Sequence, residues 1–172
     1  MEKIFDEYQK LSLLNQLKIL RDLAILRKDK NDEEIYDNHI MILQNGYTYN
    51  YQCLFEEFSP DMTIEECELV WDILDLYCAI KYSYKRIENS SINENDIYFK
   101  GFDGNNEIQL LSYCKFIMFN LHRFCELTEN GRTDFNSHYE MYYKYTKMID
   151  KWAKMNKPYD LSENQIKDIL DL

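Results

Sequence analysis

The stretch TIEECELVWDILDLYCAIKYSYKRI, from Thr63 to Ile87, carries the longest set of helix signals in the chain. Thr63 followed three residues later by Glu66 is a capping box, a side-chain pair that opens helices. Apolar side chains then cover more than half of the helical circumference, which is typical of a helix packed on most sides. Acidic residues come first and basic residues last, an order that suits the helix dipole. The stretch predicts a long helix at the centre of a bundle.

Further helices are predicted on both sides of this stretch. Leu13, Leu17 and Leu20 recur at helical spacing and predict a helix over about 5–26. A second helix from about 33 ends where Asn45-Gly46 supplies a C-terminal cap. Four more are predicted: 51–58, 105–125 capped by Asp103, a helix to about 155 capped by Asn136 or Ser137, and a last one opened by Ser162.

Length and composition favour one helical domain. The chain has 172 residues, of which only 4 are glycine and 2 are proline, too few for the many turns of an all-β protein. A chain of this size buries about 70% of its extended surface, enough for one core. We predict an all-α, single-domain bundle of about six to seven helices over residues 1–172, with at most one short extended segment near Tyr98.

Net charge and cysteine content restrict the location and the partners. The formal charge of −11 repels nucleic acid and anionic membranes unless a basic patch overrides it. Five cysteines form no Cys-x-x-Cys pair, a pattern typical of a reducing, cytoplasmic setting. No export signal is expected, because the start of the sequence, Met-Glu-Lys-Ile-Phe-Asp-Glu, has no apolar h-region. No membrane anchor is expected, because no apolar run approaches the ~18 residues needed to span a bilayer.

Several local motifs follow one another in an order and spacing that resemble the YfbU family of bacterial proteins. They are Asn15-Gln16, the 63–80 segment with Asp72-Ile73, Gly101-Phe102-Asp103, Phe135-Asn136, then Tyr145, Met148 and Trp152, and Tyr159-x-Leu161-Ser162 leading to Ile166 and Ile169. The resemblance spans nearly the whole chain. It implies a compact helical intracellular protein that self-associates, and it carries over no catalytic residue and no cofactor.

Two charged stripes have the same helical spacing and opposite sign. Glu65, Glu68, Asp72 and Asp75 offer oxygen ligands for a divalent cation or form a solvated face, and the solvated face is favoured. Lys144, Lys147, Lys151 and Lys154 lie near aromatic residues, as in single-stranded nucleic-acid sites, although core aromatics with solvated lysines are the commoner meaning. A third hypothesis places the two stripes against each other, between helices or between subunits, as a charged seam that sets orientation.

Two pairs of residues are candidates for catalysis. His122 and Cys125 stand three apart on a predicted helix, where an imidazole can approach a thiol, although a core cysteine and a boundary histidine are the simpler interpretation. Arg132 and His138 resemble the Arg-x(4 to 6)-His motif of the HEPN family of helical ribonucleases, in which Arg binds phosphate and His transfers protons. A solvated loop is the alternative.

The sequence therefore favours a non-enzymatic protein that works through protein contacts as a homo-oligomer. An aromatic content of 15%, rich in tyrosine, suits a surface built for such contacts. We predict no cofactor and no bound metal. The alternative is an RNA-binding protein or a HEPN-like ribonuclease that uses Arg132 and His138.

Overall fold

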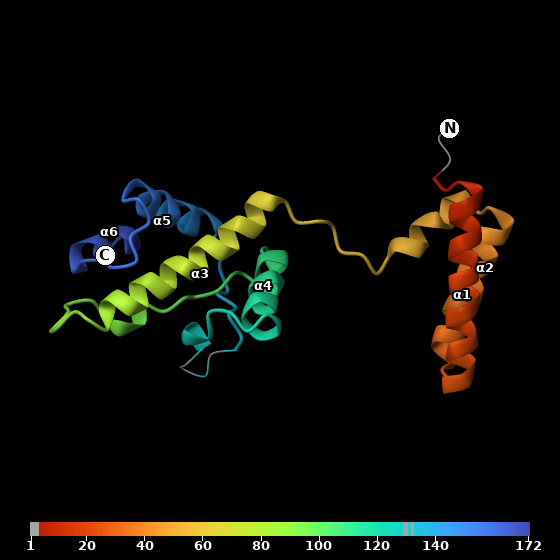
Figure 1. The fold of residues 1–172 in the computed structure, drawn as a ribbon, viewed down its shortest axis with the longest axis horizontal. Helices are drawn as coiled ribbons and strands as arrows, with labels where there is room; N and C mark the ends of the chain where they lie inside the picture. The colour runs from red at the N-terminus through yellow and green to blue at the C-terminus, as the bar shows by residue number, and fades with distance from the viewer. Residues whose placement is uncertain (1–3, 129–130, 132) are drawn as a thin grey trace. The chain divides into compact units, whose positions relative to one another are not determined.

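The structure is a computed structural model that describes residues 4–128, 131 and 133–172. It confirms the all-α fold class: six α-helices are present in the described residues, joined by short 3-10 and π segments (Figure 1). The chain divides into two compact units, Met1–Asp61 and Met62–Leu172. A single domain over residues 1–172 stays a prediction.

The first unit is a helical hairpin. Helix α1, Glu7–Arg27, opens with a capping box between Asp6 and Gln9, and α2, Lys30–Asn45, packs beside it. A left-handed Lys28 closes α1, and Gly46 closes α2 as predicted. The predicted helix at 51–58 is a 3-10 helix, Thr48–Phe55. Among the described residues of this unit, four apolar side chains are buried: Ala24, Ile40, Leu43 and Tyr51.

The second unit is built around α3, Ile64–Tyr84, which opens with the predicted Thr63–Glu66 capping box. Helices α4, Ile108–Lys115, and α5, Tyr142–Lys154, both pack on α3, and α6, Glu163–Leu170, packs on α5 (Figure 1). Ser162 and Gln165 form the predicted capping box of α6. Two 3-10 segments, Glu94–Asp96 and Cys125–Thr128, lie in the connections.

An aromatic cluster lies where α3 and α5 meet the connection before α4. The ring of Phe99 lies 5.3 Å from that of Tyr77 and 5.8 Å from that of Tyr145, and Phe102 lies 5.4 Å from Tyr145. All four side chains are buried. Edge-to-face ring contacts add roughly 0.5–1.5 kcal/mol per pair to the area they bury, so this cluster stabilises the connection as well as the helices.

Two predicted helices were wrong in their bounds. The helix expected over 105–125 ends at Lys115 and continues only as a π segment, Phe116–Asn120, because Leu121 N donates to the carbonyl five residues earlier. The helix expected to begin after Asn136 or Ser137 begins at Tyr142, without a local side-chain cap. In both places the backbone uses bonding partners that helical periodicity does not reveal.

The extended segment expected near Tyr98 is not a strand. Tyr98 itself lies in a bend, and the described residues contain only one isolated parallel bridge, between Phe102 and Asn136. No helix in the described part of the chain is both long and apolar enough to cross a bilayer.

Candidate functional site

Two loop segments cross at Gly101 and Phe135. Phe102 N donates to Phe135 O at 3.0 Å, and Ser137 N donates to Phe102 O at 3.1 Å. Gly101 has φ +88°, and a Cβ built there would lie 1.7 Å from Phe135 O. Tyr145 on α5 donates its hydroxyl to Gly101 O at 2.9 Å. Glycine is therefore required at this crossing both by its backbone angle and by the close approach of the second segment.

Asn136 holds the two segments together from the other side. Its Oδ1 accepts hydrogen bonds from Gly104 N and from His138 N, both at 3.0 Å. A Cβ at Gly104 would lie 2.9 Å from Asn136 Nδ2. The two motifs Gly101-Phe102-Asp103 and Phe135-Asn136, which are distant in sequence, are thus one hydrogen-bonded structure.

Glu107 links the same crossing to the start of α5. Its Oε2 accepts from Asp103 N at 2.8 Å, and its Oε1 accepts from Met141 N at 2.8 Å and from Tyr142 N at 2.7 Å. Glu107 and Asp103 are both buried, and Asp103 accepts hydrogen bonds from two nearby groups, the backbone N–H of residue 105 and the side-chain amide of residue 106. A carboxylate that accepts backbone N–H groups at a helix start stabilises that helix.

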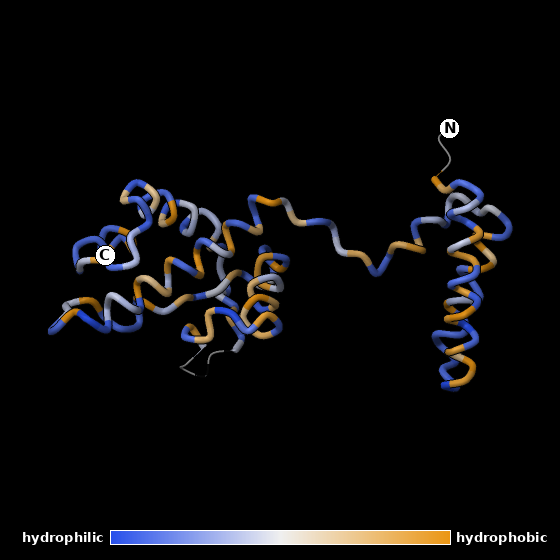
Figure 2. Tube along the Cα trace, in the orientation of Figure 1, coloured by the Kyte–Doolittle hydropathy of each residue, from blue (hydrophilic) through white to orange (hydrophobic). Residues whose placement is uncertain are grey.

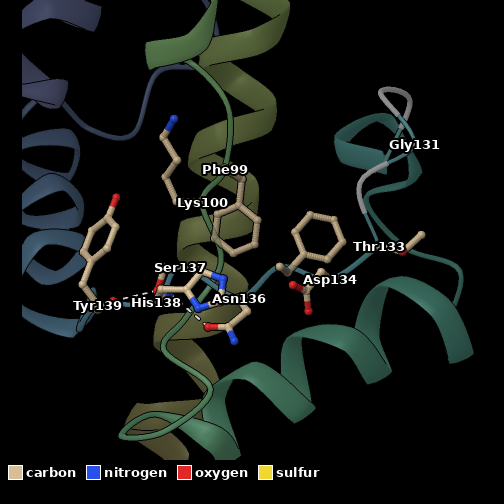
Figure 3. Close-up of a pocket in the computed structure, with 10 residues that line it drawn as sticks. Phe99, Lys100, Gly131, Thr133, Asp134, Asn136, Ser137, His138 and Tyr139 are labelled. Atoms are coloured by element: carbon tan, nitrogen blue, oxygen red, sulfur yellow. Dashed lines mark hydrogen bonds between the residues drawn. The ribbon is translucent and has the colours of Figure 1, made fainter.

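A cavity of about 470 Å³ lies beside the crossing (Figure 3). It is lined by Phe99, Lys100, Gly131, Thr133, Asp134, Phe135, Asn136, Ser137, His138 and Tyr139. Lys100 Nζ donates to Asn95 O at 2.7 Å, and Ser137 Oγ donates to Tyr139 O at 2.6 Å. Phe135 and His138 have φ of 49° and 59°, a left-handed conformation that is rare for such residues and often marks functional loops.

His138 is exposed at this cavity, and Arg132 lies outside the described residues. The backbone of His138 is fixed by Asn136, while the neighbours of Arg132 on both sides, Gly131 and Thr133, line the same cavity. The Arg132 and His138 pair therefore stays a prediction, and the backbone N–H of its histidine is hydrogen-bonded to Asn136.

His122 and Cys125 do not lie on one helix, which corrects that expectation. Both His122 and Phe124 have positive φ, so the helical path breaks before Cys125. The Cys125 thiol donates to the backbone carbonyl of His122 at 3.5 Å. Two of the remaining cysteines are buried: burial raises the pKa of Cys114 to about 12 and also raises that of Cys78, so neither is a thiolate near neutral pH.

The acidic stripe lies on α3, where Glu65, Glu68 and Asp75 are exposed. Asp72 forms an ion pair with Lys157, with Nζ 2.7 Å from Oδ1. Partial burial raises the pKa of Asp75, and the nearby Asp72 adds to the effect. Among the described residues, no group of three or more His, Cys, Asp or Glu side chains is placed to hold a metal ion.

The basic stripe lies on α5. In the described residues, none of its four lysines forms an ion pair with a residue of the acidic stripe. Lys144, Lys147 and Lys154 are exposed, and Lys151 pairs with Asp168 and Asp171 at the end of α6. The hydrogen bond that Lys151 donates to Asp171 holds the pKa of the Asp171 carboxyl below its ordinary range. The acidic stripe forms an ion pair with Lys157, through Asp72, and Lys157 lies outside the basic stripe, so the charged seam stays a prediction.

The sequence did not predict a further group of hydrogen bonds, centred on Ser83, because a serine within a helix has no sequence signal that reveals distant partners. Ser83 on α3 is buried, donates to Tyr159 O at 3.2 Å and accepts from Leu161 N at 2.8 Å. Trp152 Nε1 donates to Pro158 O at 2.8 Å. The Tyr159-x-Leu161-Ser162 motif is therefore the segment that fixes α6 to α3. Glu107 was missed for a similar reason, since its partners are about 35 residues away.

The geometry defines a class of all-α proteins in which short motifs link loops and helix ends by hydrogen bonds, with a cavity beside a loop crossing. Comparison with known proteins identifies the class: the family model described as the YfbU domain matches residues 4–172. The UPF0304 protein MJECS11 of the archaeon Methanocaldococcus jannaschii is 35% identical over 174 residues, which cover 98% of this chain and 99% of that protein. The chain belongs to the YfbU family.

Proposed function

We propose that this protein is a non-enzymatic cytoplasmic module that acts through protein contacts as a homo-oligomer. The observation that supports it is the apolar surface of the Met1–Asp61 unit, whose hairpin carries apolar residues along its length (Figure 2). Among its described residues, 14 large apolar side chains are exposed and 4 apolar side chains are buried, whereas Met62–Leu172 has 11 exposed and 26 buried.

A unit of about 60 residues with so small a core is marginally stable alone, and a covering partner stabilises it. The Tyr51 hydroxyl adds to this argument, because it is buried and has no hydrogen-bond partner in the described residues. Apolar side chains that gather on an exposed surface are typical of protein–protein contact sites.

Sedimentation velocity of the full chain over a wide concentration range tests the proposal. We expect an oligomer that dissociates on dilution and whose sedimentation is unchanged by added RNA. A monomer at every concentration, with no protein bound after purification from its own host, would contradict it.

A second candidate function, RNA binding or cleavage, is supported by the cavity at the loop crossing. There His138 lies on a fixed loop with the neighbours of Arg132, and the exposed lysines of α5 are a further basic surface. The test compares RNA binding and cleavage by the wild type with His138→Ala. Binding of RNA that falls steeply with salt, or cleavage that the substitution abolishes, would favour this candidate over the first.

A further inference from the structure

The aromatic residues on and just before α5 are of two kinds. Tyr145 and Trp152 are buried and belong to the core of Met62–Leu172. Tyr143 is 76% exposed, and Tyr139 is 55% exposed. A base stacks on an aromatic ring only where a face of the ring is accessible, so the exposed tyrosines alone are available for stacking. The structure thus separates residues that follow one another closely in the sequence.

The charge of α5 is opposite in sign to that of the chain. Four of its 13 residues are lysine and one is aspartate, whereas the chain has a formal charge of −11. Lys151 forms ion pairs with Asp168 and Asp171 at the end of α6. Lys147 and Lys154 are exposed, and neither forms an ion pair within the described part of the chain. Their charge therefore favours an anionic ligand on this helix.

Four exposed residues of α5 lie on one side of the helix. They are Tyr143, Lys147, Asp150 and Lys154. At about 100° per residue they fall within about 60° of the circumference, and no other residue of α5 does. This sector is centred about 160° from the buried residues of α5, so it points away from the core that α5 packs on. We call these four residues, together with Tyr139, the α5 strip.

The α5 strip begins at the cavity beside the loop crossing. Tyr139 lines that cavity together with His138 (Figure 3) and lies three residues before the start of α5. Three residues of chain span at most about 11 Å, so Tyr139 is close to the first turn of the helix. From Tyr143 to Lys154 the strip continues for about 16 Å along the helix axis. An extended ligand on the strip therefore passes the cavity.

We propose that the α5 strip binds a single strand of nucleic acid, with bases stacked on Tyr139 and Tyr143 and phosphates bound by Lys147 and Lys154. This inference rests on the second candidate function, RNA binding, and names its surface and the form of the strand. Stacking on tyrosine requires unpaired bases, because the bases of a duplex are already stacked on one another. The ring of Tyr142 contacts that of Tyr143 edge-on, with centroids 5.9 Å apart, and so helps to hold the stacking ring in place.

Substitutions of Tyr143 test the stacking role. Fluorescence anisotropy of the full chain with an oligouridine of about twelve nucleotides measures the dissociation constant. We expect Tyr143→Ala to raise this constant by about tenfold, and Tyr143→Phe, which keeps the ring, to change it by less than about twofold. Tyr49→Ala removes a ring that is 86% exposed in the other unit, and we expect it to change nothing. Circular dichroism checks that each variant is folded.

Charge substitutions test the path of the phosphates. For single strands, the logarithm of the binding constant falls with the logarithm of the salt concentration by about 0.7 per phosphate contact. The double variant Lys147→Gln with Lys154→Gln should therefore reduce this slope by about 1.4, and Lys30→Gln, an exposed lysine of α2, should leave it unchanged. Asp150→Asn removes the one acidic group of the strip, and we expect it to tighten binding by about threefold.

The possible outcomes separate this inference from the second candidate function. If oligouridine binds and the Tyr143 and lysine variants bind as the wild type does, the surface is wrong while RNA binding stands. A duplex that binds as tightly as the single strand overturns the stacking mode. Tighter binding of oligothymidine than of oligouridine keeps the strip and overturns RNA as its ligand. If no oligonucleotide binds at low salt, both fail, and weakened self-association of the strip variants would then identify a protein contact.

Discussion

Gly101 and Gly46 both have positive φ, 88° and 67°, but their surroundings differ. A Cβ at Gly101 would lie 1.7 Å from Phe135 O, whereas nothing lies within 4 Å of a Cβ at Gly46. The sequence was sufficient to predict Gly46 as a helix cap, because Asn-Gly after an apolar helix is a local signal. The crossing at Gly101 could not be predicted, since its partner segment is more than thirty residues away.

The two glycines give a matched test at the residue scale. We expect Gly46→Ala to lower the free energy of unfolding by about 1 kcal/mol, the cost of a side chain in the left-handed region. Gly101→Ala adds a steric clash with backbone and must break the Phe102–Phe135 hydrogen bond, so we expect a loss of more than about 3 kcal/mol. Urea titrations measure both. Equal costs would show that the crossing is not tightly packed in solution.

At the scale of single elements, helix ends that depend on local signals were predicted well. Helix ends that depend on residues distant in sequence were predicted poorly. The capping boxes at Thr63 and Ser162 were predicted because each is complete within four residues. The start of α5 was misplaced because its cap is Glu107, about 35 residues before it in sequence. The cavity beside His138 was equally hidden, because residues 99–100 come close to residues 131 and 133–139 only after the segments cross.

Glu107→Gln tests the long-range cap. The glutamine amide keeps one acceptor oxygen, but its NH₂ group then faces a backbone N–H that donates to the carboxylate in the wild type. We therefore expect the free energy of unfolding to fall by about 2–3 kcal/mol. Glu66→Gln, in the local capping box of α3, is the control, with an expected loss below about 1 kcal/mol. Hydrogen exchange at Met141 and Tyr142 should rise in the first variant alone. Unchanged exchange there would refute the capping role.

For the whole molecule, the two units differ in what stabilises them. The main apolar core draws all its buried members from between Val70 and Leu170, so Met62–Leu172 contains a complete core. Among its described residues, Met1–Asp61 buries four apolar side chains and exposes 14 large ones. Composition and length predicted one domain, because both describe the chain as an average and neither records how unevenly apolar residues are buried.

Separate fragments test this difference directly. We expect residues 62–172 to unfold cooperatively on their own, and Gly101→Ala to cost the fragment as much as it costs the full chain, because every contact of the crossing lies inside that unit. Residues 1–61 should be weakly helical when dilute and gain helix as their concentration rises, since a second copy supplies the missing cover. Circular dichroism at several concentrations measures both. If 62–172 fails to fold while the full chain folds as a monomer, the two units need each other, and the single domain predicted from composition is the better description.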